Sequence, residues 1–238
     1  MKKSIILSIA LTTALSVNAQ TLKIQGGTAI SKLDWQLDRI NSTTSLYDQN
    51  LIGHSIFAGI DYARIADYVG REYFNLSSNI GMLRKGGKHE ILFSDENGLT
   101  GETLMDKLTL DYLSINTTID LKLPIGETIF PFVSFGPRFD YVLSHSKHFD
   151  MLQEMDELKK FSTGLILGGG IKFNIGESLQ IGLRADYYYN FNDIADWRTR
   201  NTGNGGKISV NTFTIGLSVG YRFYSGWDDW ADSVSGGF

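Results

Sequence analysis

One short stretch carries the parts of a hydrolytic or metal-binding site. It reads "SHSKHFD", from Ser144 to Asp150, and holds two serines, two histidines and an aspartate. A serine nucleophile needs a base within hydrogen-bonding reach, and a catalytic zinc ion needs three protein ligands. His145 and His148 supply two ligands at most, and no spacing rule ties them to a serine. A solvated outer loop explains the stretch better, so we predict no catalytic residue, metal or cofactor.

A second group of residues consists of isolated charges spaced among small polar residues. Six are cations and four are anions: Lys23, Asp61, Asp120, Lys122, Arg138, Asp140, Lys172, Arg184, Asp186 and Arg222. Single charges of both signs suit the interior of a narrow barrel, where they can pair across strands. Arg138 with Asp186 is one expected pair, and Arg184 with Asp140 is another. We therefore predict a charge network that fills and closes the lumen.

The elements that would position these charges are strands. In "NTFTIGLSVGYRF", Asn211 to Phe223, every second residue is large and apolar, and those between are small or polar. This period of two predicts a strand with a different environment on each face. Eight such segments recur: Thr21 to Ser31, Ser55 to Ala66, Glu72 to Leu83, Lys107 to Leu123, Thr128 to Leu143, Phe161 to Asn174, Ser178 to Phe191, and Asn211 to Phe223. The fourth changes phase near Tyr112 and Leu113, which predicts a β-bulge.

The connections between these segments alternate in length. Those after the second, fourth and sixth are short, with Gly and Pro in turn positions, and the others are long and polar. Aromatic residues end the apolar face at both rims, as in Tyr187 and Tyr189 or Tyr221 and Phe223. A soluble barrel would instead show an outer face dense in charge. The sequence predicts an all-β fold, an eight-stranded antiparallel up-and-down transmembrane β-barrel with four long extracellular loops and short periplasmic turns.

The ends of the chain differ from the barrel in composition. Residues 1–19 have a basic start, an apolar run and a small-residue site, which predicts a signal peptide cleaved after Ala19. We expect the barrel over residues 20–224 and a periplasmic tail over residues 225–238. The chain has no cysteine and a formal net charge of −4, so it has no disulfide and no basic surface for nucleic acid. The expected location is the outer membrane, in contact with its lipid.

Two stretches are candidate contacts for a periplasmic or outer-membrane protein partner. "FDMLQEMDELKKF" predicts a short amphipathic helix whose apolar residues include Met151, Leu152 and Met155. The tail places Trp227 and Trp230 three residues apart among aspartates. Packing over the barrel mouth and anchoring at the membrane interface are the simpler alternatives for the helix and the tail.

Several longer stretches resemble a known family. "YLSINTTIDLKLPIGETIFPFVSFGPRFDYVLS", "STGLILGGGIKF", "GLRADYYYNFNDI" and "GLSVGYRF" are similar to the PorT-like outer-membrane β-barrel family of Bacteroidetes. The resemblance runs from about Leu22 to Phe223 and implies the barrel fold. It implies no catalytic motif, because members of the family have none in common, and a few of them are implicated in protein secretion. Its members usually stop at or near the last aromatic strand, whereas this chain continues for fifteen residues.

Three function classes follow, in order of preference. The first is a small outer-membrane barrel that acts through contacts, as a component or accessory of an envelope or secretion assembly or as a surface-exposed structural protein. The second is a narrow porin or passive channel, which needs an open path along Gly168, Gly170, Ser218 and Gly220. The third is a lipid hydrolase with its site at the outer rim.

Overall fold

The computed structural model describes residues 21–37, 49–66, 72–95, 98–125, 128–146, 158–176, 178–198 and 205–223. The expected signal peptide and the tail with Trp227 and Trp230 lie outside the described residues. So do Met151, Leu152 and Met155 of the expected helix, and His148 and Asp150 of the loop before it. Within the described ranges, no helix has the length and hydrophobicity needed to cross a membrane.

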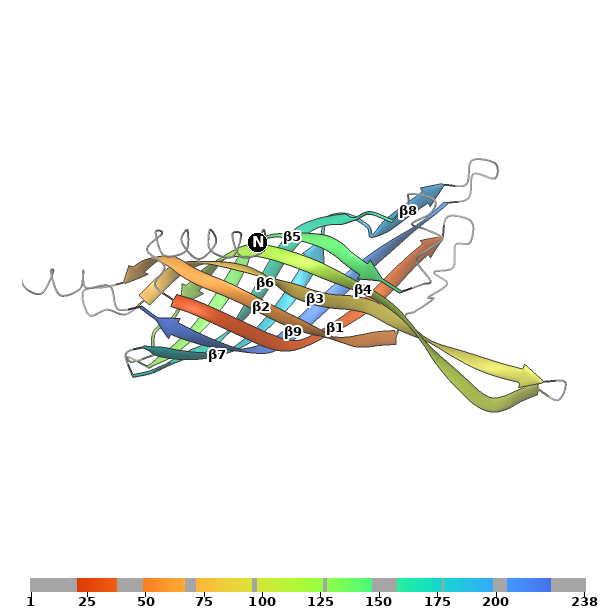
Figure 1. Ribbon diagram of the computed structural model, residues 1–238, viewed down its shortest axis with the longest axis horizontal. Coiled ribbons are helices and arrows are strands. Elements are labelled where there is room, and N and C mark those ends of the chain that lie inside the picture. The colour runs from red at the N-terminus through yellow and green to blue at the C-terminus, as the bar shows by residue number, and fades with distance from the viewer. Residues whose placement is uncertain are drawn as a thin grey trace, which may run out of the picture.

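Antiparallel strands make up the described fold (Figure 1). Their bounds are β1 Thr21–Leu37, β2 Gln49–Ala66, β3 Glu72–Asp95, β4 Gly98–Lys122, β5 Ile129–His145, β6 Phe161–Ile175, β7 Leu179–Asn190, β8 Ala195–Arg198 and β9 Gly205–Arg222. Each strand from β1 to β7 pairs with the next, β7 pairs with β9, and β9 pairs back with β1. This closes a ring of eight strands. The short β8 pairs with the outer part of β9, forms a single bridge from Ala195 to Leu158, and stands outside the ring. The predicted eight-stranded barrel is thus confirmed.

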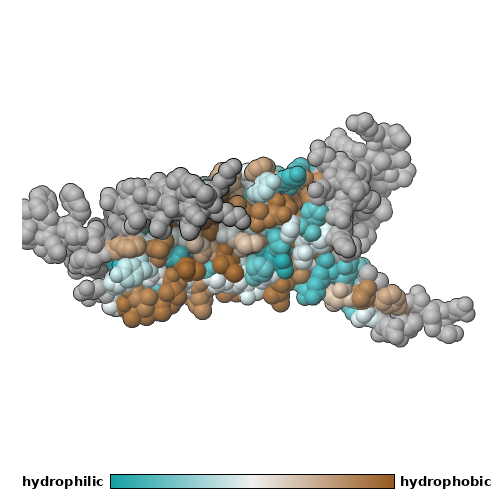
Figure 2. Space-filling view, in the orientation of Figure 1, coloured by the Kyte–Doolittle hydropathy of each residue, from teal (hydrophilic) through white to brown (hydrophobic). Residues whose placement is uncertain are grey.

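The two faces of each strand differ in side-chain size and polarity, as the alternation predicts. On β9 from Phe213 to Tyr221 the large apolar residues face outward, for example Leu217 at 61 % exposure, while Thr212 and Thr214 on the other face are buried. β5 alternates in the same way between exposed and buried residues. Hydrophobic side chains cover much of the barrel wall in view (Figure 2). A ring with apolar residues outside and polar residues inside is the arrangement of a transmembrane barrel.

The two rims of the barrel are built differently. Thr21 lies opposite Arg222, so both ends of the ring are at the rim with the short turns, the expected periplasmic side. At the other rim the strands run further than the sequence predicted. β3 and β4 stay paired out to Asp95 and Gly98, so much of the expected polar loop after the third strand is strand instead. An antiparallel ladder can extend as long as both strands supply partners.

The expected phase change in the fourth strand has a different origin. A register shift between β4 and β5 does occur between Asp111 and Tyr112. Alternation along β4 nevertheless continues unbroken, because Leu108, Leu110, Tyr112 and Ser114 are all buried on the lumen side. The predicted irregularity is therefore present at the expected position, but it does not change the face on which the residues of β4 lie. The lumen itself changes from polar to apolar toward the outer rim.

Candidate functional site

The lumen near the periplasmic rim holds a set of alternating charges, the inner charge cluster. Its members are Lys23, Asp61, Asp120, Lys172, Arg184 and Asp186, all buried. The Lys172 ammonium lies 3.2 Å from Asp61 and 2.9 Å from Asp120, and Lys23 lies 2.5 Å from Asp61. Each carboxylate of this group therefore has a cation beside it. Such pairing is what makes buried charges tolerable in a low-dielectric interior.

Arg184 extends this cluster toward the middle of the barrel. Its Nε donates to both carboxylate oxygens of Asp186, at 2.8 and 2.6 Å, and its Nη2 donates to Ser134 Oγ at 3.0 Å. Gly168 on the neighbouring strand β6 makes room for this arrangement, because a Cβ there would overlap the Asp186 carboxylate. Two residues apart on one strand, Arg184 and Asp186 point to the same face and need no other strand to pair.

A second group, the outer charge cluster, consists of Lys85, Arg138 and Asp140. The Asp140 carboxylate lies 2.6 Å from Lys85 Nζ and 3.2 Å from Arg138 Nε. Lys85 also lies 4.7 Å from the Tyr112 ring centroid, and the Arg138 guanidinium lies 4.8 Å from that of Tyr188. Cations over aromatic faces gain a favourable electrostatic contact, which helps to hold two cations beside one carboxylate.

The two ion pairs predicted within the network were wrong. Arg138 pairs with Asp140, and Arg184 with Asp186, rather than Arg138 with Asp186 and Arg184 with Asp140. Register is the reason, because Arg138 on β5 lies opposite Gly164, and Gly164 lies opposite Asn190 on β7. Arg138 accordingly donates to Asn190 Oδ1.

The structure places nine of the ten predicted network residues in buried positions, and Arg222 is intermediate at the periplasmic rim. Sequence reasoning missed Lys85, which is fully buried. A signal for it existed, since Lys85 continues the lumen side of β3 through Ser77, Asn79 and Leu83. The strand predicted from the sequence ends at Leu83 and so leaves Lys85 out.

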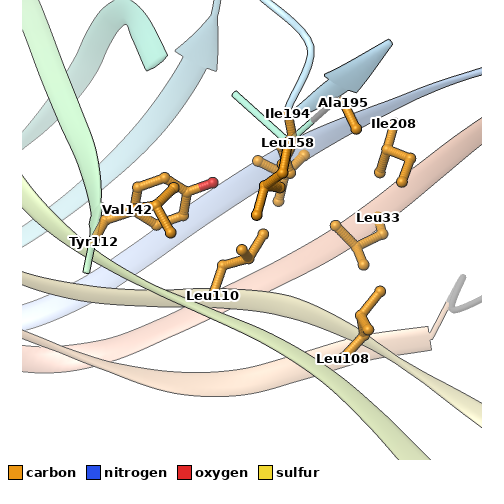
Figure 3. Packing of buried hydrophobic residues seen from close by; sticks show 10 residues of the cluster. Leu33, Leu108, Leu110, Tyr112, Val142, Leu158, Ile194, Ala195 and Ile208 are labelled. Atoms are coloured by element: carbon orange, nitrogen blue, oxygen red, sulfur yellow. The ribbon is translucent and has the colours of Figure 1, made fainter. Parts of the chain in front are cut away.

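Above the outer charge cluster the lumen is filled by hydrophobic side chains, here called the apolar cap (Figure 3). Its buried members are Leu33, Leu108, Leu110, Tyr112, Val142, Leu158, Ile194, Ala195, Ile208 and Val210, and the partly buried Trp35 packs against them. Most of them come from ring strands whose lumen side has become apolar. The cap thereby fills part of the lumen toward the outer rim.

Three cap residues come from outside the ring and fold inward. Leu158 precedes β6, Ile194 precedes β8, and Ala195 begins β8. Backbone hydrogen bonds tie them together, from Lys159 N–H to Ile194 C=O at 2.8 Å and from Ile194 N–H to Ile208 C=O at 2.7 Å. Because the two segments are bonded to each other and to β9, they hold their apolar side chains over the lumen as one unit.

Between the inner charge cluster and the cap lies a small cavity. It is lined by Gln25, Phe57, Asn79, Asn116, Ile166, Arg184, Asp186 and Tyr188. Its volume accommodates about one water molecule. The Asn79 Oδ1 atom is buried without a hydrogen-bond partner, so a water there would satisfy it. A cavity of this size is part of a filled interior and offers no room for a substrate.

The outer surface carries a polar group where its apolar band ends. Toward the outer rim, Arg84 comes next after the outward-facing Met82 on β3. On β4, Asp111 comes next after the outward-facing Leu113 in the same direction. Arg84 donates to both Asp111 oxygens, at 2.6 and 2.8 Å, and Ser144 Oγ donates to Asp111 Oδ2 at 2.9 Å. The Arg84 hydrogen bonds hold the pKa of Asp111 below its usual value.

This arrangement also accounts for part of the "SHSKHFD" stretch. Ser144 is hydrogen bonded to Asp111, while His145 Nδ1 lies 3.1 Å from the Ser146 carbonyl oxygen. Across the described residues, no three potential metal ligands come together. His148 and Asp150, the remaining parts, are outside the described ranges.

Solved structures similar to this chain are outer-membrane barrels of low sequence identity. OprG of Pseudomonas aeruginosa is 15 % identical, with 88 % of this chain and 98 % of that chain covered and a TM-score of 0.47. Outer membrane protein W of E. coli is 13 % identical over 86 % and 98 % of the two chains, with a TM-score of 0.44. The outer membrane protease OmpT of Escherichia coli is 8 % identical over 87 % and 97 %, with a TM-score of 0.41. At these identities the likeness concerns the fold alone.

Among curated proteins, no sequence matches this chain significantly. A family model does match it, and its description is an outer membrane protein β-barrel domain. The match covers residues 7–196, most of the chain, and fits the closed ring and its outward-facing apolar side chains. The chain therefore belongs to the outer membrane protein β-barrel domain family.

Proposed function

We propose that this protein is a non-enzymatic outer-membrane barrel that acts through contacts at its exposed surfaces. One observation carries the proposal, the filled lumen. Two charge clusters and the apolar cap occupy successive levels of a ring that side chains of eight strands can just fill. Because the interior is occupied by side chains, contacts with other molecules must involve the lipid-facing wall, the periplasmic rim or the outer strands.

The assembly role is the finer part of the proposal. The resemblance to PorT-like barrels of Bacteroidetes favours a component or accessory of an envelope or secretion assembly, exported with a cleaved signal peptide. Trp227 and Trp230 of the tail, and Met151, Leu152 and Met155 of the outer loop, remain the proposed partner contacts. The apolar outer face of the barrel contacts outer-membrane lipid.

The two alternative functions have less support. A passive channel needs a path along the small residues of β6 and β9, but the Asp186 carboxylate occupies the space beside Gly168, and Thr21 and Lys23 side chains crowd Gly220. A hydrolase needs a serine with a base, but Ser144 is engaged by Asp111.

Conductance in a planar lipid bilayer tests the proposal. We expect the wild-type barrel to give no stable channels. A double variant that shortens the cap, Ile194→Ala with Leu158→Ala, serves as the comparison, because it empties the inward-folded part of the cap and leaves the ring strands unchanged. Stable unitary currents from the wild-type protein would overturn the proposal in favour of the narrow channel.

A further inference from the structure

The outer charge cluster holds more positive than negative charge. Lys85 and Arg138 are cations, and both are completely buried. In the part of the chain that the structure describes, the Asp140 carboxylate is the only anion within salt-bridge distance of either cation. The nearby tyrosine rings attract the cations but carry no charge of their own. Because an uncompensated charge is costly in a low-dielectric interior, one unit of positive charge at this level needs a counter-charge.

Hydrogen-bond donors at the same level also lack acceptors. Arg138 Nη1 and Thr212 Oγ1 are both buried and have no hydrogen-bond partner. Thr212 lies opposite Tyr188 in the β7–β9 ladder, and the Arg138 guanidinium lies 4.8 Å from the Tyr188 ring centroid. A guanidinium can only donate hydrogen bonds, and a hydroxyl can rotate to donate one. Buried donors without an acceptor indicate a bound water molecule or ion.

The other buried groups without partners do not supply that acceptor. Asp140 Oδ1 and Ser114 Oγ have no hydrogen-bond partner either. Ser114 lies directly opposite Asp140 in the β4–β5 ladder, so rotation of its hydroxyl lets these two groups satisfy each other. Arg138 Nη1 and the Thr212 hydroxyl then remain as donors, in a cluster that also has the extra positive charge.

We propose that the outer charge cluster binds one small monovalent anion, of the size of chloride, between Lys85, Arg138 and Thr212. The anion balances the second cation and accepts hydrogen bonds from the unpaired donors. A water molecule supplies an acceptor but no charge. The ligand must be small, because Tyr112, Tyr188 and the apolar cap fill the lumen around this level. This site goes beyond the contact-based role and does not depend on it.

Urea unfolding of the full-length protein in lipid vesicles tests the site. A ligand that binds only the folded state stabilises it in proportion to its concentration, once that exceeds the Kd. Unfolding exposes the site, so the measurement needs no open path through the barrel. Sodium chloride is exchanged for sodium gluconate, a larger anion, at constant total concentration. Above the Kd, we expect a tenfold increase in chloride to raise the folded-to-unfolded ratio about tenfold, and bromide to replace chloride.

Variants separate a bound anion from general effects of salt. Lys85→Met leaves Arg138 and Asp140 as a neutral pair, so we expect the chloride dependence to disappear. Arg84→Met is the matched control, because it removes the same charge at the next residue of β3, on the outer surface, and should keep the dependence. Thr212→Val retains every charge and removes one donor, so chloride should bind about 2- to 10-fold more weakly.

Anomalous X-ray diffraction from crystals grown in bromide locates the ion, and we expect a peak between Lys85 and Arg138. A wild-type stability that is the same in chloride and gluconate would overturn the proposal. So would an equal chloride dependence in Lys85→Met and Arg84→Met, or bromide bound only elsewhere. Conductance is independent of these outcomes. A closed barrel without chloride dependence removes the anion site alone, whereas a conducting wild-type barrel removes the proposed function.

Discussion

The inner and outer halves of the lumen contain opposite kinds of side chain. Toward the periplasmic rim, Lys23, Lys172 and Arg184 alternate with carboxylates, whereas toward the exterior the same ring encloses leucine, isoleucine and valine. The charged half depends on directional pairs, because an ion without its partner is costly in the interior. The apolar half depends on shape and volume. When one of its side chains is shortened, the loss of stability grows with the volume of the cavity left behind.

This difference shows that one barrel can be filled in two ways, with different tolerance to change. In the charged half each residue is fixed by its neighbours, so a single substitution affects a group. In the apolar half a substitution of similar size is absorbed locally. Exterior segments can therefore contribute to the cap through Leu158 and Ile194 without matching any charge.

The largest effect is expected in the charged half. Asp120→Ala leaves Lys172 with Asp61 alone and removes a nearby anion from Arg184, and we expect a loss of about 3–5 kcal/mol in unfolding free energy. Urea unfolding in lipid vesicles measures it. The double variant Asp120→Ala with Lys172→Met keeps the Lys23–Asp61 and Arg184–Asp186 pairs, so it should recover part of the loss. A double variant as unstable as the single one would show that the pairing does not determine the cost.

A smaller and local effect is expected in the cap. Leu110 is completely buried, and Leu110→Ala should lower the unfolding free energy by about 2–5 kcal/mol, depending on how far the cap relaxes. Leu113→Ala, on the outward face of the same strand, is the matched control and should cost less. Equal losses for the two variants would contradict the assignment of Leu110 to a packed cap.

The smallest effect concerns pH and lies outside both halves. Because Arg84 holds the folded-state pKa of Asp111 below its usual 3.8, Asp111 contributes stability above that value and loses it as the pH falls through the lower folded-state pKa. Acidification should therefore destabilise the wild type more than Asp111→Asn. Unfolding midpoints measured at neutral and acidic pH compare them, and parallel pH profiles would disprove the contribution.

Much of the fold followed from the sequence because its signals are local. Period-two alternation assigned Phe213, Ile215 and Leu217 to the outer face without knowledge of any neighbour. Strand ends at the periplasmic rim were placed well, since Gly and Pro mark the turns there. Outer ends were placed less well because the Gly86–Gly87 pair after Leu83 does not end β3, and the ladder continues through it along β4.

The candidate site could be predicted from the sequence only in part. Alternation placed Arg138, Asp140, Arg184 and Asp186 in the lumen, but the pairs among them depend on register, which several strands fix together. Likewise, the apolar stretch through Leu108 and Leu110 looked like a change of face along one strand. Only the neighbouring strands and the inward-folded Ile194 reveal that the lumen itself becomes apolar there.

By itself, then, the sequence determined the number of strands in the ring and the face on which most residues lie, because both depend on backbone periodicity and turn residues. The tertiary structure decided which charges pair, where the lumen becomes apolar, and which strands extend beyond the rim. Those properties depend on the contacts between residues distant in sequence, and such contacts exist only once the ring has closed.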